Sequence, residues 1–504
     1  DCFRRAVCRS VLRTERDALR EHFWPQQTAV AVQGAAPLLA MWARTALELH
    51  PDWALVSLDL RNAFNSVSRA AALRRFRDKP ALQRLYPMLY AWGSCSADVF
   101  LGRALELGDF WSRQGFQQGD VCAMLGFCAA IHPYVVALDA ALRACGGGEA
   151  RFFADDGFLV CDMRIPAVRD ALETFWRGLR HELSLDCNRS KCAVYAPAGD
   201  ARAGWDPRWR DVPPGVWVPR GQRRAVFEAM PGNRGVLVMG VPVGAPWYVE
   251  SVLTGRGDAC VSKITTLVGK LRRRSCHALW AALKYCCVTL LHHWLQCMPP
   301  DLTLAVARQL DDALVGAVGF AVPALASCVD GLVWDRTRQP QRLRGCGLRS
   351  AVDVRHAAFL GAVEQVVPLW APLPADDDRP ARLAFSPLLA GVLGAQAFAP
   401  GGERYRRLLV RGPGLGLSLP GQIRAAWAWC RDAAGAAAGD GSLLGGDVHV
   451  LAEGKVHVQH LITKVIEDHR HSGLVARFSL LPLRDMRRVS FFNTRTAFPC
   501  SGLT

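Results

Sequence analysis

Two adjacent aspartates interrupt an apolar stretch, and among the residues of this sequence they are the ones best suited to chemistry. Asp155 and Asp156 lie at the centre of ARFFADDGFLVCD, residues 150–162. Apolar residues flank the Asp-Asp-Gly turn on both sides, which predicts a hairpin of two short strands with both carboxylates at its tip. A carboxylate pair in such surroundings is costly unless a divalent metal ion or paired arginines compensate it.

A third aspartate ends another predicted strand. The apolar run WALVSLDL, residues 53–60, carries Asp59 near its carboxyl end, and residues 61–76 then continue with helical spacing. Magnesium binds carboxylate oxygens and keeps positions open for substrate phosphates, so Asp59 would complete an acidic site. Taken singly, Asp-Asp-Gly can be an ordinary turn and Asp59 a helix cap.

A glycine-rich segment lies between these two motifs. In WSRQGFQQGDVCAMLGF, residues 111–127, Gly115 and Gly119 bracket two glutamines just before a long apolar run. Glycines allow a backbone to approach a ligand closely, and Gln118 offers both a hydrogen-bond donor and an acceptor. Alone, this motif is a weak signal.

Composition limits the class of protein. The 504 residues exceed what one hydrophobic core supports, which predicts two or more domains. Lysine and arginine outnumber aspartate and glutamate by 61 to 45, a formal charge of +16 that suits nucleic acid or an anionic membrane surface. The 18 cysteines include no C-x-x-C pair, which favours buried thiols in a reducing compartment over disulfides or a structural zinc site.

The coarse pattern predicts an α+β fold. Residues 3–24 are rich in arginine and read as one or two exposed basic helices, and residues 255–320 read as largely helical. Between them, the order strand, helix, helix, hairpin, helix, strand predicts a sheet with helices on one face. The uncharged run at residues 313–329 contains glycines and a proline and is predicted to be a buried helix and turn, so no membrane-spanning segment is expected.

Five motifs in order carry a family resemblance. They are LVSLDLRNAFNSV, GFQQGDV, FFADDG, LSLDCNRSKC and VLVMGVPVG. This set resembles the reverse transcriptases of non-LTR retrotransposons, most of all the site-specific elements, including those inserted in the spliced-leader RNA genes of trypanosomatids. The resemblance covers roughly residues 4–365 and is strongest over residues 55–245.

The resemblance implies a right-hand polymerase of palm, fingers and thumb with a mostly helical C-terminal extension. Residues 1–50 would be a basic helical remnant of the fingers, 51–250 the palm and fingers with the catalytic motifs, 251–345 a helical thumb, and 346–504 an extension of uncertain role. Complete elements also carry amino-terminal DNA-binding fingers and a carboxyl-terminal Cys/His knuckle with an endonuclease. Neither is recognised here, so a truncated copy is expected.

The resemblance also implies roles for individual residues. Asp59, Asp155 and Asp156 would form the metal site for two Mg²⁺ ions, with the Leu60 carbonyl as a further ligand, and Lys191 would assist the leaving pyrophosphate. In a two-metal displacement, one ion lowers the pKa of the primer 3′-hydroxyl and the other neutralises the triphosphate. The residues implied to contact nucleotide or primer are Phe64 as a steric gate that excludes a 2′-hydroxyl, Gln118, Gly119, Met239, Gly240 and Val241.

Basic residues implied to contact nucleic acid lie at both ends of the resemblance. Arg4 aligns with an arginine of the fingers, although the proline that follows it in the family is missing here. Lys270, Arg272, Arg273 and Arg274 begin the presumed thumb helix and would follow a duplex backbone, while a solvated helix face is the competing interpretation.

These residues predict an RNA-directed DNA polymerase that extends a DNA primer on an RNA template with dNTPs and Mg²⁺, in the nucleus and without a membrane. The oligomeric state stays open.

Val121 and Met124 replace two prolines of the family pattern, which favours an alternative: a catalytically inactive remnant that only binds RNA. An intron-encoded reverse transcriptase or a viral RNA polymerase is a third reading, and Phe64 argues against RNA synthesis.

Overall fold

The computed structural model describes residues 2–94, 97–98, 111–112, 114–117, 119–188, 191–197, 235–271, 274–321, 331–343, 345–370, 383–389, 418–435 and 458–479. The chain folds as two units, each described by itself. The first contains Asp1–Tyr248 and Pro368–Gly391, and the second contains Val249–Val367 and Val392–Thr504. The four-part division expected from the sequence stays a prediction. The structure groups residues 1–50 with 51–248 and adds residues 368–391 to them.

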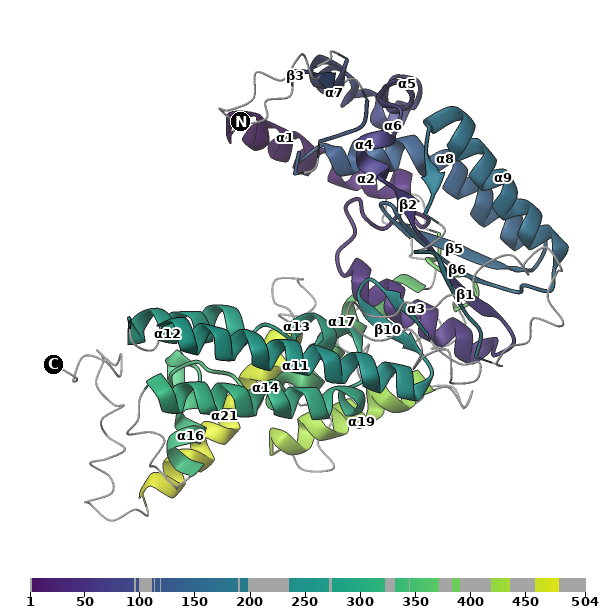
Figure 1. Ribbon diagram of the computed structural model, residues 1–504. Coiled ribbons are helices and arrows are strands. Elements are labelled where there is room, and N and C mark those ends of the chain that lie inside the picture. Colours follow the sequence, from purple (N-terminus) through teal and green to yellow (C-terminus); the bar gives the residue numbers. More distant parts are fainter. Residues whose placement is uncertain are drawn as a thin grey trace, which may run out of the picture. The chain divides into compact units, whose positions relative to one another are not determined.

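A four-stranded antiparallel sheet organises the first unit (Figure 1). Its strands stand in the order β5 (Gly148–Phe153), β6 (Asp156–Cys161), β1 (Ala54–Leu58) and β8 (Ala193–Tyr195). The predicted hairpin and the predicted strand before Asp59 are both confirmed. Chain order and spatial order differ, because the hairpin β5-β6 comes after β1 in sequence but pairs with its edge.

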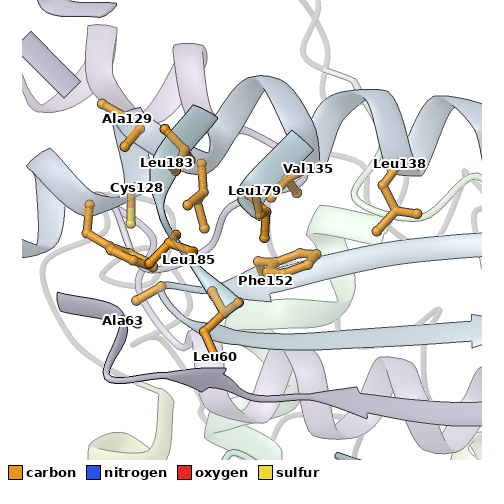
Figure 2. Packing of buried hydrophobic residues seen from close by; sticks show 14 of the residues in the cluster. Leu60, Ala63, Cys128, Ala129, Val135, Leu138, Phe152, Leu179, Leu183 and Leu185 are labelled. Carbon is orange, nitrogen blue, oxygen red and sulfur yellow. The ribbon is translucent and has the colours of Figure 1, made fainter. Parts of the chain in front are cut away.

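One face of the sheet packs against two long helices, α8 (Ala123–Ala144) and α9 (Pro166–Leu183). Alternate residues of β1 and β5 point to this face, as the period of two in a strand requires. Figure 2 shows Phe152 of β5 lying close to Leu179 of α9, with Val135 of α8 beside them. This contact places the hydrophobic core directly behind the strands that carry the aspartates.

The opposite face is covered as well, so the expectation of helices on one face only was wrong. Helix α3 (Ala35–Leu49) packs against β1 and β6, and most of its residues are buried. Its Trp42 donates a hydrogen bond from Nε1 to Glu149 of β5 over 3.2 Å. The apolar residues of this helix run almost without interruption, and such a run lacks the periodicity by which a helix is recognised in a sequence.

A buried ionic network joins this second face to a distant part of the chain. Arg151 of β5 is fully buried and donates to Asp139 from Nη1 over 2.8 Å and to the Phe385 carbonyl from Nε over 2.8 Å. Ser386 donates its hydroxyl to Glu149 over 2.6 Å. Residues 383–389 are thereby anchored to β5 across more than 200 residues of sequence.

Shorter elements complete the first unit. They are α1 (Cys2–Thr14), α2 (Arg16–Phe23), β2 (Leu60–Arg61), α4 (Ala63–Ser66), α5 (Arg69–Asp78), α6 (Pro80–Gln83), α7 (Tyr86–Gly93), β3 (Ala97–Asp98), β4 (Trp111–Ser112), β7 (Asp186–Cys187), β9 (Gly235–Val238), β10 (Val241–Gly244) and the 3-10 helix η5 (Val367–Trp370), which begins one residue before the segment 368–391. The basic helices expected over residues 3–24 are confirmed as α1 and α2.

The described part of the second unit is helical, as predicted for residues 255–320. Its central helix is α17 (Ala351–Val366), against which α13 (His292–Cys297), α14 (Pro300–Ala321), α19 (Ser418–Ala433) and α21 (Val458–Ser479) pack. The other helices are α11 (Pro246–Leu271), which starts in the first unit, α12 (Cys276–Ala282), η3 (Leu283–Cys287), α16 (Gly331–Arg338) and η4 (Gln341–Leu343).

One helix of the described chain, α8, is long and apolar enough to cross a membrane by length and composition. About two thirds of its most apolar window, 67%, is buried inside the protein. Core helices meet the same criteria, and α8 packs on both β5 and α9. Its composition therefore reflects its place in the core.

Removal of the buried guanidinium tests the network around β5. Arg151→Ala removes the cation paired with Glu149 and leaves Asp139 with Arg143 alone, and loss of one partner of a buried ion pair costs about 3–5 kcal/mol. We expect this loss as reduced hydrogen-exchange protection of residues 148–153 and 383–389. Arg180→Ala is the control, because Arg180 pairs with Asp186 and both side chains are half-exposed, where the cost is below about 1 kcal/mol. Equal protection in both variants would contradict a stabilising role for Arg151.

Candidate active site

Strand pairing brings the three predicted aspartates to one end of the sheet. Leu58, the last residue of β1, lies opposite Gly157 of β6. Asp59 follows Leu58 and Asp156 precedes Gly157, so the two aspartates come next to each other where the strand pair ends. In the hairpin, Phe153 pairs with Asp156, so Ala154 and Asp155 form the turn, and Ala154 adopts a positive φ of 55°. The three carboxylates therefore come from neighbouring strand ends.

The charges of these carboxylates oppose one another. Protein atoms crowd the Asp156 carboxyl although the residue lies at an exposed hairpin tip. This desolvation, together with the charges of Asp155 and Asp59, raises the pKa of Asp156 to about 6. Burial also raises the pKa of Asp155, and the charge of Asp59 adds to that effect. The positive charge of the nearby Lys191 lowers the pKa of both groups. Among the described residues, Lys191 is the one cation that acts on these acids.

Asp59 is held by its backbone and leaves its carboxylate available. Its carbonyl accepts a hydrogen bond from the Asn188 amide over 2.9 Å, and its own amide donates to Cys192 Sγ over 3.4 Å. Lys191 Nζ lies 3.9 Å from Oδ1. Oδ2 is buried and has no hydrogen-bond partner among the described residues. A buried carboxylate oxygen without a partner is costly, and a cation would satisfy it.

The donor set fits a hard divalent cation with open coordination positions. Carboxylate oxygens are the ligands that Mg²⁺ prefers, and Mg²⁺ is usually held by one or two carboxylates together with substrate phosphates. Across the described ranges, no group of three or more His, Cys, Asp or Glu side chains is placed to hold a metal ion by itself, and this includes Asp59, Asp155 and Asp156. Asp59 and Asp155 thus suit a site that substrate completes, and the two-ion prediction stays a prediction.

Phe64 is fixed close to the glycine motif. Its ring stacks on Phe127 with centroids 4.7 Å apart, and its carbonyl accepts a hydrogen bond from the Phe116 amide over 2.6 Å. Gly115 has a φ of +72°, and a Cβ atom there would lie 2.3 Å from the Asn65 carbonyl oxygen. The close backbone approach at this glycine is to the chain itself, and the expected approach to a ligand stays a prediction.

The second glycine of the motif differs from the first. Gly119 is exposed with a φ of +87°, and a Cβ atom there would meet nothing within 4 Å. Its neighbour Gln118 lies outside the described residues. The space beside Gly119 is open, as a nucleotide-binding position requires, and its role stays a prediction.

Arg4 has a protein partner that the sequence did not indicate. Its guanidinium forms an ion pair with Asp120 and lies over the Trp92 ring at 5.1 Å from the centroid. The other oxygen of Asp120 accepts the Cys122 amide over 2.9 Å, near the start of α8. Arg4 thus ties α1 to the glycine motif, and contact with nucleic acid stays a prediction.

The predicted primer-contacting residues form a tight turn. Met239 and Gly240 connect β9 and β10 with φ values of 52° and 77°, and Val238 faces Val241 across the hairpin. Two positive φ values at the centre of a two-residue hairpin loop are typical of a type I′ turn. A non-glycine residue such as Met239 in this region costs about 1–2 kcal/mol.

The remaining predicted residues separate into two groups. Leu60 is buried in β2, where it pairs with Cys187 near the acidic site. Lys270 and Arg274 are exposed in the second unit, and Arg272 and Arg273 lie outside the described residues. The structure therefore brings Asp59, Asp155, Asp156 and Lys191 together, and it does not test contacts of the basic segment.

Comparison with known proteins gives one kind of match. No family model and no curated protein matches the chain. It is similar to the solved structure of an apo telomerase from Candida tropicalis, with 9% identity and a TM-score of 0.35 over 72% of this chain and 58% of that one. A telomerase from Candida albicans in complex with a TWJ fragment of telomeric RNA gives 9% and 0.35, over 70% and 54%. This likeness is too low to support a function, and it spans less than two thirds of either telomerase chain.

The two motif glycines provide a matched pair of substitutions. Gly115→Ala and Gly119→Ala both place a side chain at positive φ, which costs about 1 kcal/mol in each. Only Gly115→Ala also forces a Cβ atom into backbone, which adds about 1–3 kcal/mol. We expect reduced amide protection of residues 114–127 for Gly115→Ala and little change for Gly119→Ala. Similar protection in both variants would show that the contact with Asn65 is absent.

The pKa of Asp156 predicts a pH dependence in metal-free buffer. A carboxyl whose pKa is raised by folding stabilises the folded state when protonated, and this stability is lost as the pH rises through about 6. Between about pH 4.5 and pH 7, the melting temperature of the wild type should fall relative to that of Asp156→Asn, and Mg²⁺ should reduce the difference. Asp78→Asn is the control, since the hydrogen bond from Arg77 lowers the pKa of Asp78. If the melting temperatures of the wild type and of Asp156→Asn changed with pH in parallel, this titration of Asp156 would be excluded.

Proposed function

We propose that this chain is an RNA-directed DNA polymerase of the non-LTR retrotransposon type. The observation that carries the proposal is the convergence of Asp59, Asp155 and Asp156 at neighbouring strand ends, where Lys191 is the one cation among the described residues that acts on them. Groups with strongly perturbed pKa values in such a cluster mark functional sites. In a nucleotidyl transfer, magnesium ions that bind together with the triphosphate would supply positive charge to these carboxylates.

Each residue of the acidic cluster would have a separate role in the reaction. Asp59 and Asp155 would hold two Mg²⁺ ions, which supply the charge that activates the primer 3′-hydroxyl and neutralises the triphosphate. Asn188 and Cys192 fix the Asp59 backbone, so its carboxylate is positioned before substrate arrives. Lys191, at 3.9 Å from Asp59, places an ammonium where it can pair with the leaving pyrophosphate. Asp156 adds negative charge beside them.

The product would be DNA. Phe64 is the fifth residue after Asp59, and its stacking on Phe127 holds the ring in one orientation. A rigid ring at the sugar of an incoming nucleotide excludes a 2′-hydroxyl by its bulk. The pattern of the five motifs assigns this position to Phe64, with Gly119 and the unconfirmed Gln118 at the templating pair.

The partners follow from charge and family pattern. A formal charge of +16 suits an RNA template and a DNA primer or target, and dNTPs would be the second substrate. In this proposal the first unit supplies palm and fingers, and residues 251–345, which belong to the second unit, form the thumb. A nuclear location is part of the same proposal, because the DNA target of such an element lies in chromosomes.

Primer extension tests the proposal. The chain should extend a labelled DNA primer on an RNA template with dNTPs and Mg²⁺, whereas Asp155→Asn combined with Asp156→Asn should lower the rate by at least about a thousandfold. Asp52→Asn combined with Asp78→Asn, which removes the same number of charges at two half-exposed sites, should extend like the wild type. Incorporation of rNTPs as readily as dNTPs would contradict the role of Phe64.

Absence of extension has a defined meaning. Folded wild-type protein that binds RNA but adds no nucleotide would replace the proposal with the inactive remnant. Val121 and Met124, which stand where the family has prolines, would then be the first positions to change, as Val121→Pro and Met124→Pro. Extension that the double aspartate variant retains would remove the acidic cluster from the mechanism.

A further inference from the structure

A cavity of about 310 Å³ lies between the first two helices and the start of α8. Leu12 of α1, Leu19 of α2, Val30 of the following loop and Leu125 of α8 contribute to its wall. The wall is mainly apolar and its volume is within the range of small-ligand sites. None of the side chains of the acidic cluster lines it, so it is a separate feature of the first unit.

Three arginines stand around the same cavity. Arg9, Arg13 and Arg16 are exposed, and all three line it. Their spacing of four and three residues places them along one side of α1 and the start of α2. Within the described part of the chain, none of the three forms an ion pair or hydrogen bond. The adjacent carboxylate of Glu15 is paired with Arg84 instead.

The combination of charge and cavity fits a flexible polyanion that also has flat apolar groups. Guanidinium groups pair with phosphates through their planar fork of donors. An apolar cavity accepts an unstacked base, and a base that is still paired in a duplex cannot enter it. We propose that this arginine-lined groove binds single-stranded nucleic acid, with an unpaired base in the cavity and phosphates at Arg9, Arg13 and Arg16.

A second, smaller cavity lies beside this one at the glycine motif. Val121 lines both cavities, and Arg4, Gly119 and Asp120 also border the smaller one. Met124, whose unbranched side chain adapts to irregular shapes, lines the larger cavity. The two positions that depart from the family pattern are therefore part of its wall. If the proposed polymerase function holds, on which this identification rests, the strand in the groove is the RNA template.

Binding measurements separate charge from base insertion. Labelled single-stranded RNA is titrated against the whole chain by fluorescence anisotropy, without Mg²⁺ and dNTPs. We expect the triple variant Arg9→Ala, Arg13→Ala, Arg16→Ala to weaken binding at least tenfold and to lower the salt slope by about 2. Arg74→Ala, Arg77→Ala, Arg177→Ala removes equal charge elsewhere in the unit and should change affinity less than threefold.

The cavity has its own test. Ala29→Leu fills it without a change of charge. An abasic nucleotide at the bound position should cost the wild type about fivefold or more in affinity and should cost Ala29→Leu little. Unchanged RNA binding by the triple arginine variant, equal affinity for the same RNA in a duplex, or equally effective competition by polyglutamate would each overturn the proposal.

The same proteins distinguish this proposal from the polymerase proposal. A wild type that binds single-stranded RNA through these arginines but does not extend a primer would keep the groove and reject the polymerase. A wild type that extends, together with a triple arginine variant that binds and extends equally well, would keep the polymerase and reject the groove.

Discussion

The register between β1 and β6 is the constraint on which the acidic site depends. Leu58 faces Gly157, and this pairing places Asp59 next to Asp156. A shift of one residue would turn the apolar face of β1 away from α8 and α9 and would bury the wrong side chains. Packing of the core therefore fixes the register, and the register fixes the distance between like charges. The free energy that holds the carboxylates together comes from residues that carry no charge.

Much of the candidate site was predictable because its signals are local. The hairpin around Asp155 is marked by apolar runs on both sides of a turn, and β1 before Asp59 has an equally clear boundary. Each of these features requires only about ten residues of sequence.

Features that depend on distant residues were not predictable. The pairing of Arg4 with Asp120 joins residues 116 positions apart. The sequence of a basic helix does not indicate which of its arginines forms an ion pair within the protein. Likewise, Cys192 contacts the Asp59 amide from 133 positions away, although the segment around Cys192 was recognised as a motif. Helix α3 lies within residues 1–50, which were predicted to be helical, but its place on the second face of the sheet was not predicted, because its apolar residues cover most of its circumference.

The anchor of residues 383–389 on β5 has a consequence for synthesis of the chain. Glu149 and Arg151 are buried on a face that Phe385 and Ser386 help to cover. A ribosome translates the whole of residues 249–367, which belong to the second unit, before these partners emerge. During this time β5 has a charged face, with Glu149 and Arg151, that is not yet fully covered. The first unit reaches its final packing only late in synthesis, and chaperones have that interval in which to bind it.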